Sequence, residues 1–261
     1  MTPPPTVLHW PGGGGSWDPS QLSSLVAWYD ADAITGLNDG DPISTWSDAH
    51  GVFDVSATSG ERPIFKTSIQ NSRPVVRFDG SDDRLKRSGS PITGTTARTF
   101  GIVAKADVVT YTSIIGIGKE AWSGSGNGQV FNITPEVAAR VNGSKTFTTG
   151  FGTSAFRLLV MSCPSSAITT DISAWLDGAA LTQSTTSGTS INTLSSGEEF
   201  LIGELGSFSS TANFDGDIAE IVVCDAEATT NDRQRLEGYL AHKWGLAANL
   251  PSSHPYKSNA P

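Results

Sequence analysis

The chain has 261 residues, of which 37% are hydrophobic, and this is enough to bury the core of one main domain. Its 26 acidic residues outnumber its 17 basic ones, which gives a net charge of −9 and argues against a nucleic-acid-binding surface. Abundant glycine, serine and threonine favour many strands joined by turns, so we expect an all-β protein.

The N-terminal residues 1–21 are rich in proline and glycine and have no periodicity, which predicts an extended arm. Trp10 and Trp17 are candidate anchors in a partner subunit, because large aromatic side chains contribute much interface energy. The alternative, that both fold back onto their own domain, stays open. No secretory signal or membrane-spanning run is recognisable, so we expect synthesis as a cytoplasmic product. The main domain is expected at 22–257, followed by a tail at 258–261.

Short apolar or alternating runs separated by turn residues predict about a dozen strands, which implies a two-layer sandwich. We expect 113–117 to form a hairpin with 99–107. The predicted strands lie at 25–30, 43–46, 62–65, 74–78, 99–107, 113–117, 129–133, 137–141, 145–148, 156–163, 172–177, 181–183 and 200–203.

The longest unbroken pattern runs from 213 to 246 and reads as a strand followed by a helix. The strand is apolar on both faces, as in the centre of a sheet. Thr229 and Asp232 predict a helix start and Gly245 a helix end, so we expect a helix over 231–244. Its apolar side chains should dock it on the sandwich edge: Leu236, Leu240 and Trp244.

Several segments together resemble the concanavalin A-like lectin/glucanase superfamily. They are LVAWYDAD, TWSD, RPVVRFDGSDDRL, AWLDG, FDGDIAEIVVCD and RLEGYLAHKWGLAANLPSSHPYK. The likeness is greatest to laminin G-like jelly-roll domains of phage structural proteins and bacterial surface proteins, and it covers about 22–257. It implies two packed antiparallel sheets in a jelly roll, with binding, adhesive or structural roles more usual than hydrolysis.

The candidate catalytic residues are Asp215, Asp217 and Glu220 in DGDIAE. Glucanases of this superfamily use the pattern Glu-x-Asp-x-x-Glu, in which a bulge brings both glutamates to one face. Here Asp215 replaces the first glutamate, and without a bulge Glu220 would face away from it. Retaining hydrolysis requires the two carboxyl groups about 5 to 5.5 Å apart. We therefore expect a structural strand and no enzyme activity, with a glycoside hydrolase as the lesser alternative.

A second acidic group, Asp79, Asp82 and Asp83 in FDGSDDRL, has the oxygen ligands that calcium takes. Turn formation by Asp-Gly, with the other carboxylates solvated or paired to Arg84 and Arg87, explains the same residues. We favour the turn interpretation, so no cofactor is expected, with calcium as the alternative.

A glycan site needs an aromatic face and a few polar groups. Trp122, in a glycine-rich loop, meets this description together with Tyr111, Asn127 and Gln129. A lone tryptophan in a loop is equally a protein contact, so that alternative stays open.

The two cysteines, Cys163 and Cys224, lie in apolar strand contexts and are interpreted as buried free thiols, although their pairing stays open. The sequence as a whole predicts a non-catalytic structural or accessory protein of a phage-like virion, oligomeric through its arm and able to contact surface polysaccharide. The alternatives are a stand-alone lectin-like module and an extracellular or cell-surface location.

Overall fold

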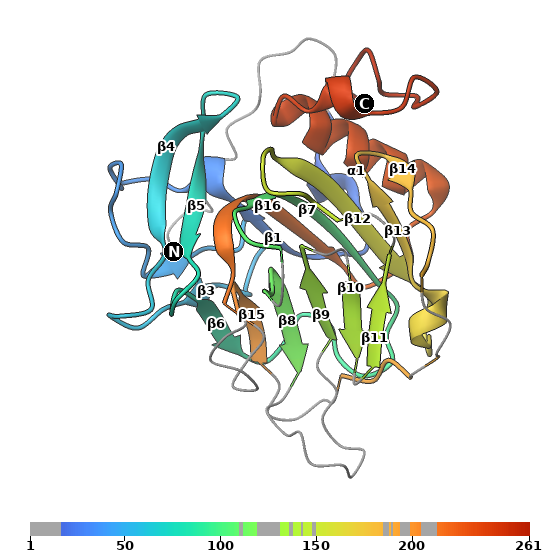
Figure 1. The fold of residues 1–261 in the computed structure, drawn as a ribbon, viewed down its shortest axis with the longest axis horizontal. Helices are drawn as coiled ribbons and strands as arrows, with labels where there is room; N and C mark the ends of the chain where they lie inside the picture. Colours follow the sequence, from blue (N-terminus) through green and yellow to red (C-terminus); the bar gives the residue numbers. More distant parts are fainter. Residues whose placement is uncertain are drawn as a thin grey trace, which may run out of the picture.

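The computed structural model describes residues 17–109, 112–118, 131–135, 138–141, 143–147, 150–184, 188, 190–193, 199–204 and 213–261. Within these ranges, two antiparallel sheets of eight strands each form a sandwich, with one α-helix near the C-terminus (Figure 1). The all-β, two-sheet fold class with a C-terminal helix is thereby confirmed.

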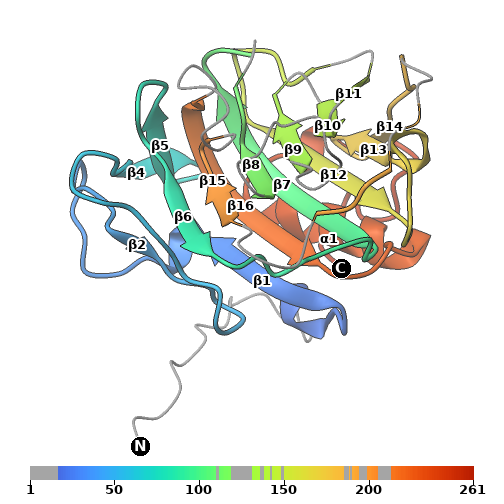
Figure 2. The ribbon, with the colours of Figure 1, turned by 90° about the horizontal axis from the view of Figure 1, so that it is seen from below.

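The first sheet is built around the long strand predicted from the sequence. Its strand order is β14-β13-β12-β7-β16-β5-β4, and β1 also pairs with β16. All pairings are antiparallel, and β16 is central because β1, β5 and β7 all bond to it (Figure 2). The strands are β1 (Leu25–Asp30), β4 (Ile64–Gln70), β5 (Arg73–Asp79), β7 (Arg98–Ala106), β12 (Arg157–Cys163), β13 (Ser173–Leu176), β14 (Ala179–Ala180) and β16 (Asp215–Cys224).

The second sheet has the order β11-β10-β9-β8-β15-β6-β3-β2. Ring stacking between Tyr29 on β1 and Phe200 on β15, with centroids 5.8 Å apart, joins the two inner faces. The strands are β2 (Thr45–Trp46), β3 (Val55–Ser56), β6 (Leu85–Ser88), β8 (Ile115–Gly118), β9 (Phe131–Thr134), β10 (Ala138–Val141), β11 (Gly143–Thr146) and β15 (Glu199–Ile202).

The expected hairpin between 99–107 and 113–117 is wrong. Strand β7 pairs with β12 and β16 in the first sheet, whereas β8 pairs with β9 and β15 in the second. The apolar runs identify both strands but do not select their partners, because β7 is buried on both faces and accepts any apolar neighbour. The strand expected at 181–183 is replaced by an isolated bridge between Gln183 and Phe147.

The helix α1 (Thr230–Lys243) starts where the sequence predicts. The side chain of Thr229 accepts a hydrogen bond of 3.1 Å from the backbone N–H of Asp232. The helix covers β7 and β12 on the outer face of the first sheet, so the expected docking at the sandwich edge is wrong. Gly101 on β7 makes this approach possible, since a Cβ there would lie 2.8 Å from Leu236 Cδ2.

The segment after α1 folds back onto the helix. The fully buried Glu237 accepts hydrogen bonds from Arg233 and lies 3.0 Å from Nε2 of His254. Gly238 leaves room for Tyr256, because an added Cβ would lie 2.5 Å from the Tyr256 Cβ. Among the described helices, none has the length and apolar character needed to cross a membrane. Both cysteines are buried and free, as interpreted from the sequence.

Candidate functional site

A bulge in β16 brings its three acidic side chains to the same face. The register between β16 and β7 shifts between Ile218 and Glu220, which removes one step of the alternation. Asp215, Asp217 and Glu220 therefore all point to the outer face, on the side of α1. Glu220 is expected opposite Asp215 only in the absence of a bulge, and because the bulge is present both side chains lie on the same face. Accessibility, rather than the direction of the side chain, decides what each carboxylate can do.

Glu220 is completely buried under the end of α1. Its Oε1 accepts a hydrogen bond of 2.7 Å from the indole of Trp28, and its Oε2 accepts one of 2.6 Å from the indole of Trp244. The Nζ of Lys243 lies 2.8 Å from the same Oε2. Burial raises the pKa of Glu220, although the nearby Lys243 ammonium opposes this. A substrate has no access to this carboxylate.

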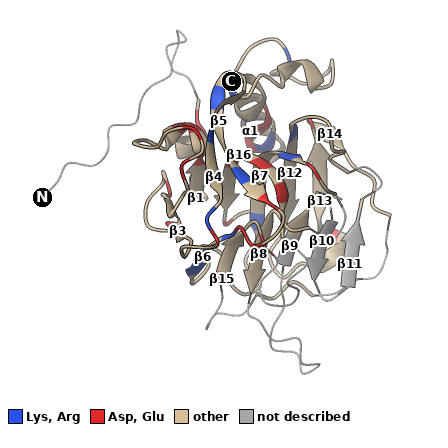
Figure 3. Ribbon diagram, turned by 60° about the vertical axis from the view of Figure 1, so that its left-hand side comes forward, with Lys and Arg blue, Asp and Glu red and all other residues tan. Residues whose placement is uncertain are grey.

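Asp217 is also buried and accepts two hydrogen bonds from Arg77 on the neighbouring strand β5. The distances are 2.6 Å from Nε and 2.9 Å from Nη2, a two-point ion pair. Lys105 on β7 is the register partner of Asp217 on its other side. The three residues form a row of alternating charge across β5, β16 and β7, where Figure 3 shows basic and acidic segments together.

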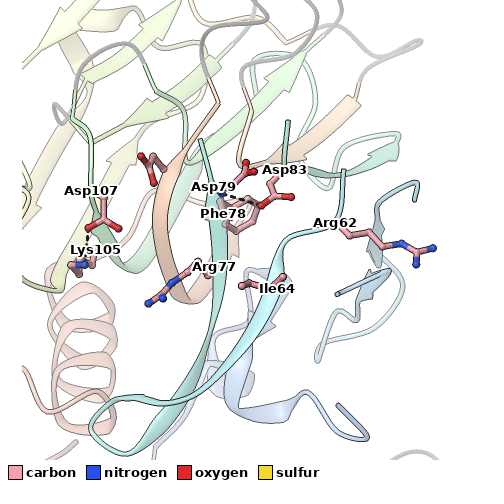
Figure 4. A pocket seen from close by; sticks show the side chains of 9 residues that line it. Arg62, Ile64, Arg77, Phe78, Asp79, Asp83, Lys105 and Asp107 are labelled. Carbon is pink, nitrogen blue, oxygen red and sulfur yellow. Dashed lines mark hydrogen bonds and ion pairs between the residues drawn. The ribbon is translucent and has the colours of Figure 1, made fainter. Parts of the chain in front are cut away.

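Asp215 is the accessible member of the three and lines a pocket of about 500 Å³. Within the described part of the chain, its carboxylate has no hydrogen-bond partner. Burial, followed by the negative charges of Asp107 and Asp79, raises its pKa. The pocket is lined by β4, β5, β7, β16 and residues next to these strands, and most of the lining residues are charged (Figure 4): Arg62, Ile64, Arg77, Phe78, Asp79, Asp83, Lys105, Asp107 and Asp215.

Sequence reasoning did not find the basic members of this pocket. Arg77 and Lys105 alternate with apolar residues in their strands, and nothing local distinguishes them from other surface cations. They meet only because β5 and β7 both pair with β16. A signal would be the match of basic residues on two strands with an acidic residue on the strand between them. This match can be recognised only when the strand order is known.

The acidic turn after β5 carries the candidate calcium ligands Asp79, Asp82 and Asp83. One carboxylate oxygen from each lies within 4.8 Å of the others. Backbone N–H groups already occupy two of them: Asp79 accepts from Ser81 at 2.8 Å, and Asp83 accepts from Asp79 at 2.9 Å. Burial and the charge of Asp79 raise the pKa of Asp83 to about 6. Carboxylate oxygens are ligands that calcium takes. The hydrogen bonds that Asp79 and Asp83 accept are, however, those of a turn.

Of the two alternatives for the other carboxylates of this turn, solvated or paired with Arg84 and Arg87, the pairing is not formed. Arg84 instead binds Glu61 and the carboxylate of Glu204. Arg87 lies over the ring of Phe53, 4.7 Å from its centroid. Both arginines have other partners because the chain enters the second sheet after the turn: Arg84 directly precedes β6, and Arg87 lies on it.

The aromatic candidates fall into two groups. Trp17 is only 7% exposed, and its ring contacts Tyr239 of α1 edge to face at 6.1 Å. It therefore follows the alternative that was kept open, folding onto its own domain instead of anchoring a partner subunit. The other candidates lie outside the described residues, so their positions stay predictions: Trp10, Tyr111, Trp122, Asn127 and Gln129.

A scan against protein-family models and a search among curated proteins gave no match. Solved structures do resemble the chain. A sialidase from Trypanosoma rangeli in complex with sialic acid superposes on 86% of this chain, with a TM-score of 0.55 and 14% identity. Domain 4 of an extracellular GH43 arabinanase from Geobacillus stearothermophilus, in complex with arabinotriose, superposes on 82% of it, with a TM-score of 0.54 and 12% identity.

The two neighbours differ in how much of their own length is matched. The superposition takes in 34% of the sialidase chain but 98% of the arabinanase domain. The present chain thus spans about a third of the sialidase and nearly the whole of that single domain. At 12–14% identity these similarities show a shared sandwich fold.

Proposed function

We propose that this chain is a non-catalytic, lectin-like domain of the concanavalin A-like type that binds polysaccharide. The pocket on the outer face carries this proposal. The carboxylate of Asp215, which has no hydrogen-bond partner among the described residues, can accept hydrogen bonds from a ligand. Arg77 and Lys105, which also bind Asp217 and Asp107, can donate them. Sugar hydroxyls both donate and accept, so a wall of mixed charge suits them, and a volume of about 500 Å³ is within the usual range for ligand pockets.

The surroundings of β16 support binding without turnover. Retaining and inverting glycosidases both need two accessible carboxyl groups on either side of the scissile bond. Glu220 lies beneath two indole rings, and Asp217 is held by Arg77, so neither reaches a substrate. Asp215 alone remains accessible among the three residues predicted from the sequence.

The comparison with the arabinanase supports the same ligand class. That domain was solved with arabinotriose bound, and the present chain matches almost its full length. A domain of this size and fold therefore suffices to hold an oligosaccharide. We therefore propose polysaccharide as the ligand class, and the sugar itself is to be found by experiment.

The test is retention of the purified protein in native gels that contain arabinan or another soluble polysaccharide. We expect wild type to be retarded by at least one polysaccharide. Asp215→Asn and Lys105→Gln should each weaken retention about tenfold, because each removes a charged hydrogen bond to the ligand. Asp225→Asn, which removes an exposed charge at the other end of β16, is the matched control.

Two outcomes separate the possible sites. Retention that is lost in Trp122→Ala but unchanged in both pocket variants moves the site to the predicted loop. Retention by none of the polysaccharides contradicts the proposed function.

For the setting of the domain, we propose a structural or accessory component of a phage-like virion, which contacts other virion proteins through the N-terminal arm. This rests on the sequence resemblance and the composition of the arm, and a cell surface is the alternative setting. Deletion of residues 1–16 is the appropriate test, because it leaves the buried Trp17 in place. Loss of particle incorporation by a folded deletion variant is expected, and unchanged incorporation contradicts the role of the arm.

A further inference from the structure

Beneath the C-terminal end of α1, one lysine lies between two carboxylates. The Nζ of Lys243 is 2.6 Å from Oδ2 of Asp30 and 2.8 Å from Oε2 of Glu220. The side chains of Lys243 and Asp30 are each 11% exposed, and that of Glu220 is not exposed at all. Burying three charged groups is costly where apolar residues would also fill the space, so the arrangement suggests a use beyond packing.

Aromatic rings enclose the lysine amine. The Nζ of Lys243 lies 5.9 Å from the ring centroid of Trp28, 5.4 Å from that of Tyr239 and 5.3 Å from that of Trp244. The ring of Trp17 packs edge to face against that of Tyr239. Burial of Lys243 favours an uncharged amine next to a carboxylic acid over the ion pair, whereas the charges of Glu220 and Asp30 oppose this and raise the pKa of Lys243.

The backbone holds the three groups in place. Asp30 on β1 and Glu220 on β16 are direct register partners, so their side chains stand next to each other. The carbonyl of Lys243 accepts hydrogen bonds from Asn71 at 2.9 Å and from Arg73 at 3.1 Å. Amine and carboxyl group are thus oriented before any reaction, which removes most of the entropic barrier to joining them.

We propose that Lys243 and Asp30 form an intramolecular isopeptide bond and that Glu220 is the catalytic carboxylate of this self-reaction. Glu220 accepts one proton from the Lys243 ammonium and passes it to an oxygen of Asp30. The neutral Nζ attacks Cγ of Asp30, and the Nζ–Cγ bond forms. Glu220 then carries a second proton from this nitrogen to the same oxygen, and the Cγ–O bond breaks as that oxygen leaves as water.

The balance of the reaction needs no other reactant. Two of the three ammonium protons leave with one Asp30 oxygen as water, and the third remains on the amide nitrogen. Glu220 ends as the carboxylate it was at the start. Burial, which raises the pKa of Glu220, suits it to carry the proton in transit.

The bond has a consequence for the domain as a whole. It joins positions 213 residues apart and fixes α1 to strand β1, enclosing most of the sandwich in one covalent loop. Neither cysteine provides such a link, since both are free. The cross-link makes the fold resistant to proteases and to heat.

The direct test is the mass of the intact, denatured protein followed by peptide mapping. We expect wild type to be lighter than its sequence by one water molecule, with the peptide containing Asp30 joined to the one containing Lys243. Mild base distinguishes this amide, which survives, from a succinimide at an Asp-Gly step, which opens. The exposed pair of Lys66 and Asp39, at 2.5 Å but without a third carboxylate, is the internal control and should remain unlinked.

Variants define the role of each group. Lys243→Arg should have the full mass and migrate more slowly on a denaturing gel than the looped wild type. Glu220→Gln should lose the cross-link while circular dichroism still reports the β fold. Wild type at the full sequence mass, or separate Asp30 and Lys243 peptides in the digest, overturns the proposal, and this result does not depend on the folding of any variant.

Discussion

The indole Nε1 of Trp244 lies 2.6 Å from Oε2 of Glu220, so the first residue after α1 is hydrogen-bonded to the central strand of the sheet. Both side chains are completely buried. The carboxylate that the sequence presents as a candidate nucleophile or acid is therefore a docking point for the helix.

Trp244→Phe tests this docking point. The variant keeps an aromatic ring but removes the indole N–H, so Oε2 of Glu220 loses this hydrogen bond. We expect the unfolding free energy to fall by about 1–3 kcal/mol. Trp175→Phe is the matched control, because Trp175 is partly exposed and contacts Arg233 through its ring face. Urea unfolding measures both. Equal losses in the two variants would show that the indole hydrogen bond contributes little.

Gly101→Ala tests the packing of α1 on the face of the sheet. The added Cβ would lie 2.8 Å from Leu236 Cδ2 and 3.1 Å from Leu240 Cδ1, so these leucine side chains, or the helix that carries them, must shift. We expect a loss of about 1–3 kcal/mol by overpacking. Gly60→Ala, where an added Cβ meets no atom within 4 Å, should leave the melting temperature almost unchanged. An unchanged melting temperature in Gly101→Ala contradicts the close approach of α1.

Asp83 should make stability depend on pH. Its pKa rises from 3.8 to about 6 on folding, because burial and the charge of Asp79 disfavour the carboxylate. The folded state then binds more protons than the unfolded state, so this contribution is fully present below 3.8 and is lost as the pH rises through about 6. Asp83→Asn should gain about 2 kcal/mol relative to wild type between about pH 4 and pH 7. Urea unfolding at both pH values measures this, with Asp82→Asn as the control for removing a charge from the same turn.

A further prediction concerns calcium binding at the acidic turn. If its hydrogen bonds serve turn formation, added calcium leaves the melting temperature unchanged. Differential scanning calorimetry with calcium and with a chelator measures this. A rise with calcium that disappears in Asp82→Ala would instead assign a calcium site to Asp79, Asp82 and Asp83.

The central strand and the helix were predictable because their patterns are long and local. The run at 215–224 is almost entirely buried, and Thr229, Asp232 and Gly245 mark the ends of the helix. Strand pairing was not predictable, since any apolar strand can lie next to β7. The bulge at β16 was equally hidden, because no glycine or proline marks Ala219.

The candidate site required the strand order. Asp215 stands out in the sequence, but Arg77 and Lys105 join it only through register. Lys243 and Asp30 are 213 residues apart and carry no motif that relates them. They lie together because β1 pairs with β16 and because α1 packs on the outer face of the same sheet.

Incubation of the wild-type protein with a polysaccharide that retains it tests the central claim, that this domain binds and does not cleave, most directly. Both bound protein and newly formed reducing ends are measured in the same sample. The account predicts bound protein with no increase in reducing ends over the buffer control. Steady release of reducing ends by wild type, abolished in Glu220→Gln, would contradict it, because the buried carboxylate would then have to reach the substrate.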